Sequence, residues 1–576
     1  MKINTTFKLF INHLGYEQQG SKKFIVRAPE NTSMTQFQLI NELSETVYQG
    51  KIDNIGSVDR WHDWFFWQGD FSDLTDTGRY QIQIKTDDGV AFSHPFEIKY
   101  GLLPEECLTD LIFYFKGQRS SGIYDRVDSN APFVGDRDER VDVHGGWYDA
   151  SGDFSKYLSH LSYANYMNPQ QIPMVVWGMA HTLEHTQDSQ NPRLAGLMVR
   201  LQEETAHGAD FLVRMQDPAG YFYMNIFDKW SHDPEQREIC AYETNQGHKK
   251  DDYQAGYRQG GGMTIAALAR VSTLHLSGNY TSKQCLETAE KGFQHLETHN
   301  LDYLNDGKEN IIDDYCALFA ATELYRATSN EIYLNVARRR KTLLIARLSK
   351  DDTYQNWWRA DDTGERPYFH AAESGLPVMA LLRYREIEPD STSKKEALDA
   401  VEKALTFELT ITKEVANPFG YARQYVKPLN EAKRTTFFFP HNNESGYWWQ
   451  GENARLGSIA SASLMAAPHF EGTFRQELQR HAINQLDWIL GLNPYDISMM
   501  NGKGRNYPLY YEDGFPNAPG GVCNGITGGF DDEQSIDFWP DEHQDTFHNW
   551  RWAEQWIPHG GWLMIALSMI EETLHN

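Results

Sequence analysis

Residues 141–157 read VDVHGGWYDASGDFSKY, and this stretch decides how the rest of the chain is interpreted. Two carboxylates, Asp149 and Asp153, lie four residues apart in a segment rich in glycine and aromatic residues. Glycine lets a backbone bend sharply and approach a ligand closely, and two neighbouring carboxylates can together hold and deprotonate one water molecule. A solvated acidic turn or a calcium loop is the alternative, because Asp-Gly turns are common.

The composition limits the class of protein. The chain has 576 residues, a formal net charge of −27 and 40% hydrophobic residues, so it can form a large core and repels nucleic acid. Five scattered cysteines without a CxxC pair argue against a disulfide scaffold or a zinc cluster. No stretch reaches the ~20 apolar residues of a membrane span, and residues 1–15 lack the apolar core of a secretion signal. We therefore expect a cytoplasmic protein with neither a nucleic-acid nor a membrane partner; the sequence does not indicate its oligomeric state.

The pattern of the chain predicts a β-rich N-terminal domain over residues 1–100 and a helical domain over residues 105–576. Residues 100–104 are expected to form the linker. Short β-rich runs separated by turn signals predict a small sandwich; they occupy residues 7–11, 24–27, 37–40, 64–67 and 80–84. Segments with 3.6-residue periodicity and long loops between them predict an α/α toroid whose loops gather at one face; they occupy residues 173–185, 192–216, 264–277, 313–327, 329–348, 394–409, 456–467, 473–490 and 561–574.

A third acid lies far from Asp149 and Asp153 in the sequence. Cleavage of a glycosidic bond needs an acid on the leaving-group side and a base or nucleophile opposite it. The best candidate is Glu554, in residues 548–562, which read HNWRWAEQWIPHGGW. Desolvation beside the tryptophans would raise the pKa of this glutamate toward that of a general acid. The alternative is a glutamate near a helix terminus that pairs with Arg551.

Together these motifs resemble glycoside hydrolase family 9 with an N-terminal immunoglobulin-like domain. The resemblance implies a mainly α fold, in which a small all-β immunoglobulin-like sandwich precedes an (α/α)6-barrel catalytic domain, and an inverting mechanism. It implies that Asp153 is the general base, that Asp149 helps to hold the water, and that Glu554 is the general acid. The motifs that carry it are INHLGY at 11–16, GGWYDASGD at 145–153, DWILGLNP at 487–494 and PGG at 519–521.

Two departures from the cellulases of this family bear on the substrate. Ser151 makes the spacing of the loop acids four, where those cellulases have three. Residues 506–513, NYPLYYED, lack the His-His-Arg group that contacts the sugar in cellulases. The loop WYDASGD, followed by SKYLSHL, resembles the exo-β-D-glucosaminidase branch of marine chitin-using bacteria. That resemblance implies release of glucosamine from the non-reducing end of chitosan oligosaccharides or partly deacetylated chitobiose.

A protonated 2-amino group needs a carboxylate or carbonyl partner, and the sequence does not choose among Asp142, Glu373, Glu444 and Asp513. A cellodextrinase, β-glucosidase or endoglucanase of the same family is one alternative function. A sugar-binding relative without catalytic activity is the other.

Further residues are candidates for substrate binding, each with a structural alternative. His144 would contact the sugar or brace its loop, and Glu452 would bind sugar hydroxyls or pair with Arg455. Aromatic pairs would form a sugar platform or fill the core; they are Trp357 with Trp358 and Tyr447 with Trp448. No cofactor and no metal ligand are expected, although a structural calcium ion at residues 251–252 or 313–314 is an alternative, since acids also favour helix N-termini.

Overall fold

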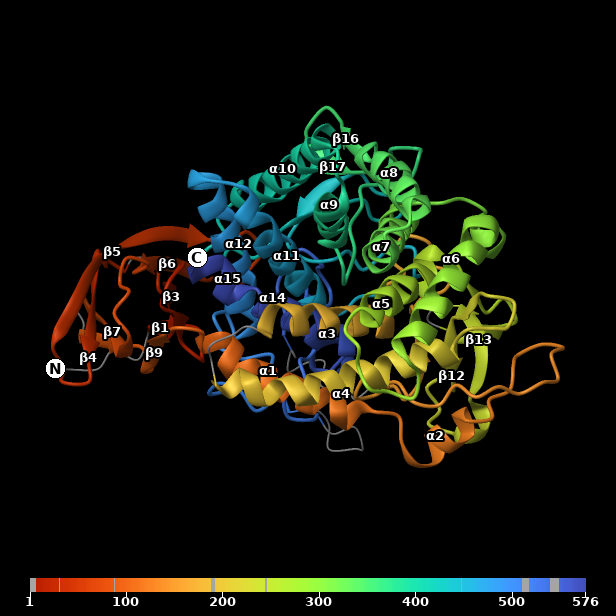
Figure 1. Cartoon of the computed structure of the whole chain (residues 1–576). Helices are drawn as coiled ribbons and strands as arrows, with labels where there is room; N and C mark the ends of the chain where they lie inside the picture. Colours follow the sequence, from red (N-terminus) through yellow and green to blue (C-terminus); the bar gives the residue numbers. More distant parts are fainter. Residues whose placement is uncertain are drawn as a thin grey trace.

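Figure 1 shows a β-rich part at one end of the molecule and a larger helical part that makes up the rest. This computed structural model describes residues 7–30, 32–86, 89–187, 192–243, 246–446, 448–509, 517–538 and 548–575. Within these ranges, none of the helices is long and apolar enough to cross a membrane.

The N-terminal part is a β-sandwich. Its strands pair in the order β1-β3-β6-β5-β4-β7-β9-β2, with β8 on β7, and all pairs are antiparallel except β2 with β9. The long strand β5 pairs with both β4 and β6 and shifts register between Asn54 and Gly56, so the strands fold around one core. The strands are β1 Lys8–Phe10, β2 Tyr16–Glu17, β3 Lys23–Ala28, β4 Gln36–Asn41, β5 Thr46–Ser57, β6 Phe65–Asp70, β7 Gly78–Thr86, β8 Gly89–Phe92 and β9 Phe96–Lys99.

Six helices of the second part form a closed ring, because each packs on the next and the last packs on the first. Such a ring is the arrangement expected of an (α/α)6 barrel. The ring helices are buried on nearly every side, so their sequences lack a strong polar face. In ring order they are α3 Ile172–Thr186, α5 Gly262–Ser272, α7 Ile311–Thr328, α9 Leu376–Ile387, α11 Asn453–Ala466 and α14 Ile557–Ser568.

A second set of helices packs on the outside of this ring. Most of these outer helices are amphipathic, and α6 opens with a capping box between Thr281 and Gln284. They are α1 Leu102–Gln118, α4 Pro192–Arg214, α6 Ser282–Tyr303, α8 Glu331–Ile345, α10 Ser391–Lys413 and α12 Gly472–Ile489. Short helices complete the domain: α2 Gly122–Asp128, α13 Trp550–Ala553 and α15 Ile570–His575.

Short strands lie in the loops between the helices. The largest group pairs in the order β10-β12-β13-β14 and begins directly after the acidic loop at Lys156. The strands are β10 Lys156–Tyr157, β11 Phe222–Tyr223, β12 Asn225–Phe227, β13 Glu238–Glu243, β14 His248–Lys250, β15 Gln254–Ala255, β16 Leu348–Lys350, β17 Gln355–Trp358, β18 Gln424–Val426 and β19 Arg434–Thr436.

The predicted β-rich and helical parts are thus confirmed, with differences in detail. Each predicted strand and each predicted helix lies on an element of the structure. Helix α1 begins at Leu102, inside the expected linker, since Pro104 fits the first turn of a helix, where no N–H partner is needed. Helices α1, α6 and α9 had not been predicted.

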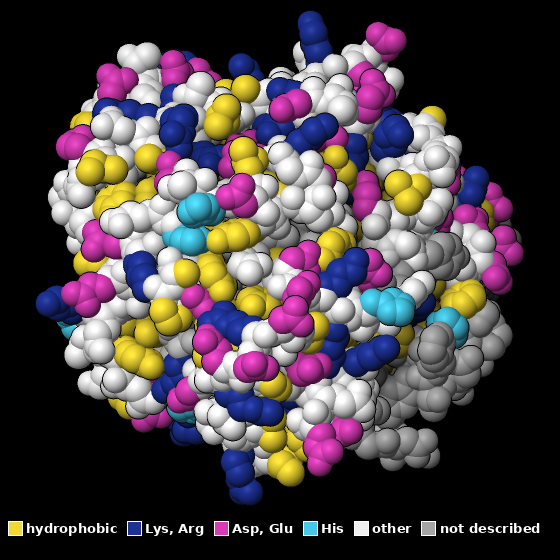
Figure 2. Space-filling model, turned by 90° about the vertical axis from the view of Figure 1, so that its right-hand side faces the viewer, with side chains coloured by type: hydrophobic (Ala, Val, Ile, Leu, Met, Phe, Trp, Pro, Cys, Tyr) yellow, Lys and Arg dark blue, Asp and Glu magenta, His cyan; other side chains and the backbone are white. Residues whose placement is uncertain are grey.

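The two parts pack directly against each other. The backbone N–H of His13 donates to the Leu490 carbonyl at 2.9 Å, and the Asn12 amide donates to Asp487 at 2.8 Å. Burial raises the pKa of Asp487 to about 7, although this hydrogen bond and the Lys23 charge oppose the shift. The DWILGLNP segment at 487–494 therefore contributes to the domain interface. On the opposite end of the molecule, Figure 2 shows acidic and basic side chains interspersed over the surface.

Candidate active site

The acidic loop is held in a sharply bent course. Gly145 and Gly146 have φ values of +85° and +72°, and a side chain at Gly146 would lie 2.8 Å from the Phe211 ring. Trp147 is fully buried and donates to Glu204 at 2.9 Å, so it anchors the loop on α4 and offers no face to a sugar. These contacts explain why the sequence needs two glycines followed by a tryptophan at this point.

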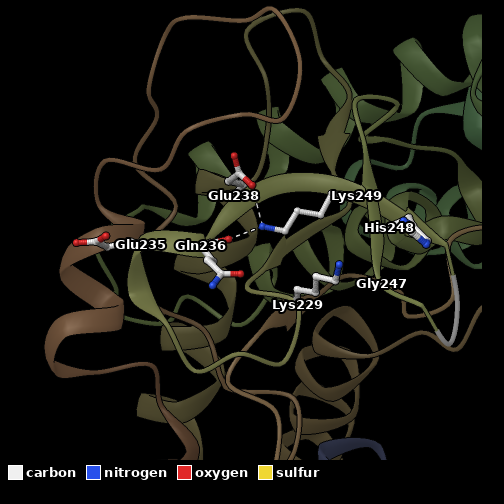
Figure 3. Close-up of a pocket in the computed structure, with 7 residues that line it drawn as sticks. All are labelled: Lys229, Glu235, Gln236, Glu238, Gly247, His248 and Lys249. Atoms are coloured by element: carbon white, nitrogen blue, oxygen red, sulfur yellow. Dashed lines mark hydrogen bonds and ion pairs between the residues drawn. The ribbon is translucent and has the colours of Figure 1, made fainter.

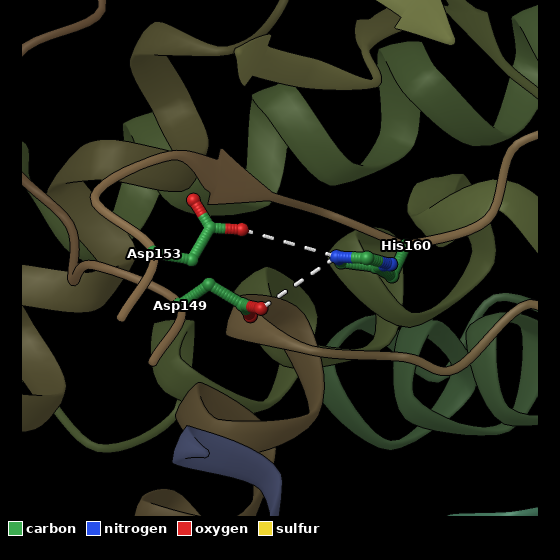
Figure 4. Close-up of side chains that lie close together, drawn as sticks. All are labelled: Asp149, Asp153 and His160. Carbon is green, nitrogen blue, oxygen red and sulfur yellow. Dashed lines mark ion pairs between the residues drawn. The ribbon is translucent and has the colours of Figure 1, made fainter. Parts of the chain in front are cut away.

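A tight turn then presents both acids. The Ala150 and Asp153 backbones exchange two hydrogen bonds of 3.2 and 3.3 Å, and the Asp149 N–H donates to the Ser155 carbonyl at 3.0 Å. Ser151 lies within this turn. The four-residue spacing therefore brings the carboxyls of Asp149 and Asp153 to one side of the loop, where both face His160 (Figure 4).

Asp153 is surrounded by hydrogen-bond donors. Its Oδ1 accepts from the Ser155 N–H at 2.8 Å, and its Oδ2 accepts from the Tyr157 hydroxyl at 2.7 Å and the Trp230 indole at 3.1 Å. The Nε2 atom of His160 lies 4.0 Å from the same oxygen. Burial by itself raises the pKa of this carboxyl, but His160 and the donors outweigh burial and hold the pKa below its usual value.

Asp149 has the opposite tendency. The Trp556 indole donates to both of its oxygens at 3.0 Å, and the Gln171 amide, just before α3, donates to Oδ1. Burial raises the pKa of Asp149 well above the usual value, and the charges of Asp153 and Glu554 add to the shift. The pKa values of the two acids in the loop are therefore shifted in opposite directions, as those of coupled acids at short range are.

The segment that carries Glu554 is pinned to the acidic loop through Ser151. The Ser151 N–H donates to the Gln555 carbonyl at 2.8 Å, and the Gln555 N–H returns a bond of 3.0 Å to the Ser151 hydroxyl. Nearby, the Ile557 N–H donates to the Asp149 carbonyl at 3.0 Å. The extra residue of the loop thus connects two acids that are about 400 residues apart in sequence.

Glu554 has the properties of a protonated acid. It follows α13 in an extended conformation, and part of its surface is accessible while its carboxyl is deep in the protein. Burial raises its pKa to about 8, the Asp153 charge adds to this, and hydrogen bonds from the Asn524 amide and the Gly152 backbone oppose it. A carboxylic acid that keeps its proton at neutral pH, near an ionised carboxylate, can protonate a leaving group while the carboxylate activates water.

The loop from Asp228 to His232 supports Asp153 from outside. Three of its non-glycine residues, Lys229, Trp230 and His232, have positive φ values between 55° and 63°. Such backbone strain persists where the surroundings enforce it: Trp230 donates to Asp153, and His232 bonds the Gly152 carbonyl at 3.1 Å. The outer side of this loop borders an open pocket (Figure 3), lined by Lys229, Glu235, Gln236, Glu238, Gly247, His248 and Lys249.

The predicted substrate-binding residues differ in their surroundings. Trp448 is half-buried and stacks near Trp550, four residues before Glu554, so it lies on the side of the acid. His144 bonds Asp142 at 2.6 Å within its own loop, which favours the bracing alternative. Trp357 is 1% exposed in β17 and packs on Phe407 and Tyr425.

Two more of these residues belong with the core, and one lies outside the described residues. Trp358 is buried and packs in the core of the helical domain. Tyr447 lies outside the residues that the structure describes. Both oxygens of Glu452 are occupied, which favours its structural alternative; its donors are Arg455, Gln424, Tyr421 and the Phe439 N–H.

The acids considered for an amino group or for calcium have protein partners. Glu373 is fully buried and accepts from the Gln170 N–H at 2.7 Å, and Glu444 pairs with Arg366. Asp513 lies outside the described residues. At the start of α7, Asp313 pairs with Arg258 at 3.3 Å and Asp314 with Arg347 at 2.8 Å, so arginines satisfy the two acids.

Sequence reasoning missed several residues that complete the site: His160, Tyr157, Trp230, Gln171, Trp556 and Asn524. Three of them had a weak signal. Tyr157 and His160 lie in the SKYLSHL segment, and Trp556 lies two residues beyond Glu554. Trp230, Gln171 and Asn524 had none, because only the fold brings them to the acids.

A carboxylate with a low pKa and a separate glutamate with a raised pKa, both in the loops of a helical ring, are the two groups that glycoside hydrolysis requires. The comparisons agree. The chain belongs to glycosyl hydrolase family 9, whose model matches residues 105–521. Residues 4–88 match the cellulase N-terminal ig-like domain.

Relatives and solved structures extend this similarity over nearly the whole chain. A cellodextrinase of Butyrivibrio fibrisolvens is 24% identical over 562 residues, covering 92% of each chain. Endoglucanase 22 of Oryza sativa subsp. japonica is 25% identical and covers 70% of each chain. A metagenome-derived family 9 endoglucanase has a similar fold, with a TM-score of 0.68 at 18% identity over 98% of both chains.

Proposed function

We propose that this protein is an inverting glycosidase that releases glucosamine from the non-reducing end of chitosan oligosaccharides or partly deacetylated chitobiose. In this reaction Asp153 takes a proton from a water molecule held with Asp149. Glu554 gives its proton to the glycosidic oxygen. Inversion requires a separation of roughly 6.5–9.5 Å between acid and base, which leaves room for that water.

One observation carries the assignment of the sugar. The carboxyls of Asp149, Asp153 and Glu554 converge in a buried space, where repulsion from the Asp153 carboxylate adds to burial in raising the pKa values of Asp149 and Glu554. A neutral glucose ring does not relieve this repulsion. A sugar with an ammonium group at C2 does, through charge-assisted hydrogen bonds that are about twice as strong as neutral ones.

The absence of a cellulase-type His-His-Arg group among the described residues supports the same proposal. Residues 506–509 contain neither histidine nor arginine. Arg505 pairs with Asp496 at 2.7 Å, and its backbone contacts His13 of the N-terminal domain. Its side chain is therefore engaged at the domain interface, away from the acids.

The test is a comparison of two disaccharides under identical conditions. We expect the purified full-length chain to release glucosamine from chitosan disaccharide with a kcat/KM at least tenfold above that for cellobiose. It should leave carboxymethylcellulose nearly untouched. Preferred release of glucose from cellobiose would overturn the proposal.

A cellodextrinase is the second candidate, since the Butyrivibrio fibrisolvens protein of that name aligns over 92% of the chain. The same assay separates the two, because a cellodextrinase releases glucose or cellobiose from cellotriose and ignores chitosan disaccharide. A sugar-binding relative without activity would hydrolyse neither compound.

A further inference from the structure

Three side chains with metal-binding atoms converge at the base of the acidic loop. The Nε2 atom of His160 lies 3.8 Å from Asp149 Oδ2 and 4.0 Å from Asp153 Oδ2 (Figure 4). Within the described residues, these are the three whose ligating atoms all lie within 4.8 Å of one another. The acids approach from one side and the imidazole from the other, so the space between them is bounded by ligands.

Each of the three side chains is oriented by a further protein group. The Tyr242 hydroxyl lies 2.7 Å from Nδ1 of His160, which directs Nε2 toward the carboxylates. Trp556 fixes Asp149, and Tyr157 fixes Asp153. Metal-binding histidines and carboxylates in proteins have such outer partners, which set the ring tautomer and the direction of each ligand.

We propose that Asp149, Asp153 and His160 bind a divalent transition-metal ion such as Zn²⁺, and that this ion inhibits the enzyme. One imidazole and two carboxylates suit Zn²⁺, whereas Ca²⁺ and Mg²⁺ require a shell of oxygen ligands alone. Three protein ligands leave a coordination position open.

The geometry needs little adjustment to bind the ion. Zinc–ligand bonds of about 2.0–2.1 Å place two ligand atoms about 3.4 Å apart. Each distance from His160 therefore shortens by about half an ångström, which a small rotation of its ring achieves. His160 keeps 15% of its side chain exposed, so the ion reaches the cluster from solvent.

Inhibition follows from where the ion binds. A metal on Asp153 withdraws electron density from the carboxylate that removes a proton from water, and it fills the space in which water and sugar meet. The ion and a sugar therefore exclude each other. This inference does not depend on which sugar is the substrate, because it concerns only the carboxylates and the imidazole.

Titration calorimetry with ZnCl2 on the EDTA-stripped full-length chain tests the site without any substrate. We expect one binding event in the wild type, weakened at least tenfold in His160→Gln and several-fold in Tyr242→Phe. His299→Gln is the control, since His299 is exposed on α6 and pairs with Asp302 there; it should bind Zn²⁺ as the wild type does. Circular dichroism checks that each variant is folded.

A kinetic measurement provides the second readout. On whichever sugar proves to be the substrate, Zn²⁺ should raise KM and leave kcat unchanged, and EDTA should reverse the effect. Wild-type zinc affinity in both His160→Gln and Tyr242→Phe would overturn the proposal. So would inhibition that does not weaken as the sugar concentration rises. If calorimetry finds the site while no sugar is cleaved, the metal site stands and the proposed function fails.

Discussion

At the residue scale, the chain sets three carboxyls of one site to different protonation states. Asp153 receives three hydrogen bonds and lies near His160, so it stays ionised. Glu554 accepts fewer hydrogen bonds than Asp153 does, from the Asn524 amide and the Gly152 backbone, and burial keeps it protonated. Environments that separate the pKa values of titratable neighbours identify which acts as base and which as acid.

Replacing Glu554 tests its role as the acid. Glu554→Gln keeps the shape of the side chain and removes the transferable proton, so kcat/KM should fall by about 10²–10⁴-fold. The melting temperature should not fall, because an uncharged, protonated carboxyl is replaced by a neutral amide of nearly the same shape. Glu235→Gln, on the exposed rim of the pocket in Figure 3, is the control and should retain full activity. Activity of Glu554→Gln near that of the wild type would exclude this residue as the acid.

The pH dependence of activity follows from the same environments. An acid works while protonated, so kcat/KM should decline as the pH rises through about 8, the pKa of Glu554. The low pKa of Asp153 keeps the base ionised well into acidic solution. In Asn524→Ala the alkaline decline should move to higher pH, because the Asn524 amide favours ionised Glu554. A pH–rate profile measures both, and a decline near pH 5 would contradict the assignment.

The three acids could be predicted from the sequence, whereas most of their supporting residues could not. Asp149, Asp153 and Glu554 stand in segments where neither helix nor strand packing requires an acid. Trp230, Gln171 and Asn524 have no such local signal, because their role arises when segments distant in sequence meet. Conversely, Trp357 and Glu452 are residue types that often bind sugars. Only the fold shows that both side chains are buried.

At the scale of elements, the acidic loop and the segment before α14 work as one unit. The two bonds between Ser151 and Gln555, together with the bond from Ile557 to Asp149, join the base side to the acid side. The Gln555 side chain continues this connection to the loop at Ala518. Ser151 therefore positions the base side and the acid side relative to each other.

The variant Ser151→Ala tests this connection. It removes the hydroxyl that accepts from the Gln555 N–H and leaves that buried donor unpaired, which costs about 1–3 kcal/mol. We expect kcat to fall about tenfold with little change in KM, because the acids shift relative to the bond and sugar contacts remain. Ser129→Ala is the control, since it removes only an exposed hydrogen bond from the Ser129 hydroxyl to the Arg126 carbonyl at the end of α2. An unchanged kcat in Ser151→Ala would show that the connection is dispensable.

Regular periodicity explains part of which elements could be predicted, although α6 has a clear buried face and was missed. Helices such as α4 and α10 alternate buried and exposed faces and were found from that pattern. Helices α1 and α9 are buried along most of their length, so their sequences show little periodicity. Strand β5 was missed for a different reason: its mostly exposed residues carry no alternating apolar pattern.

At the scale of the whole molecule, the N-terminal sandwich and the helical domain share one core. Trp61, in the loop after β5, is fully buried among aromatic residues of the helical domain; its ring lies 4.7 Å from Phe437, 6.0 Å from Phe438 and 6.2 Å from Trp488. Phe437 and Phe438 directly precede Phe439 in the sequence. The Phe439 N–H donates a hydrogen bond to Glu452. The sandwich therefore supports a loop on the same side as Trp448 and Glu554.

Replacing Trp61 shows whether the two parts unfold together. Trp61→Ala removes a large side chain from a packed aromatic cluster, so the free energy of unfolding should fall by about 3–5 kcal/mol. Because the cluster spans both parts, calorimetry should show one unfolding transition in the wild type, moved to lower temperature in the variant. Leu43→Ala, in the same sandwich but 77% exposed, should leave the transition unchanged. Two separate transitions in the wild type, with only the smaller one moved by Trp61→Ala, would mean that the sandwich is an independent appendage and that its contact with the Phe437 loop does not stabilise the site.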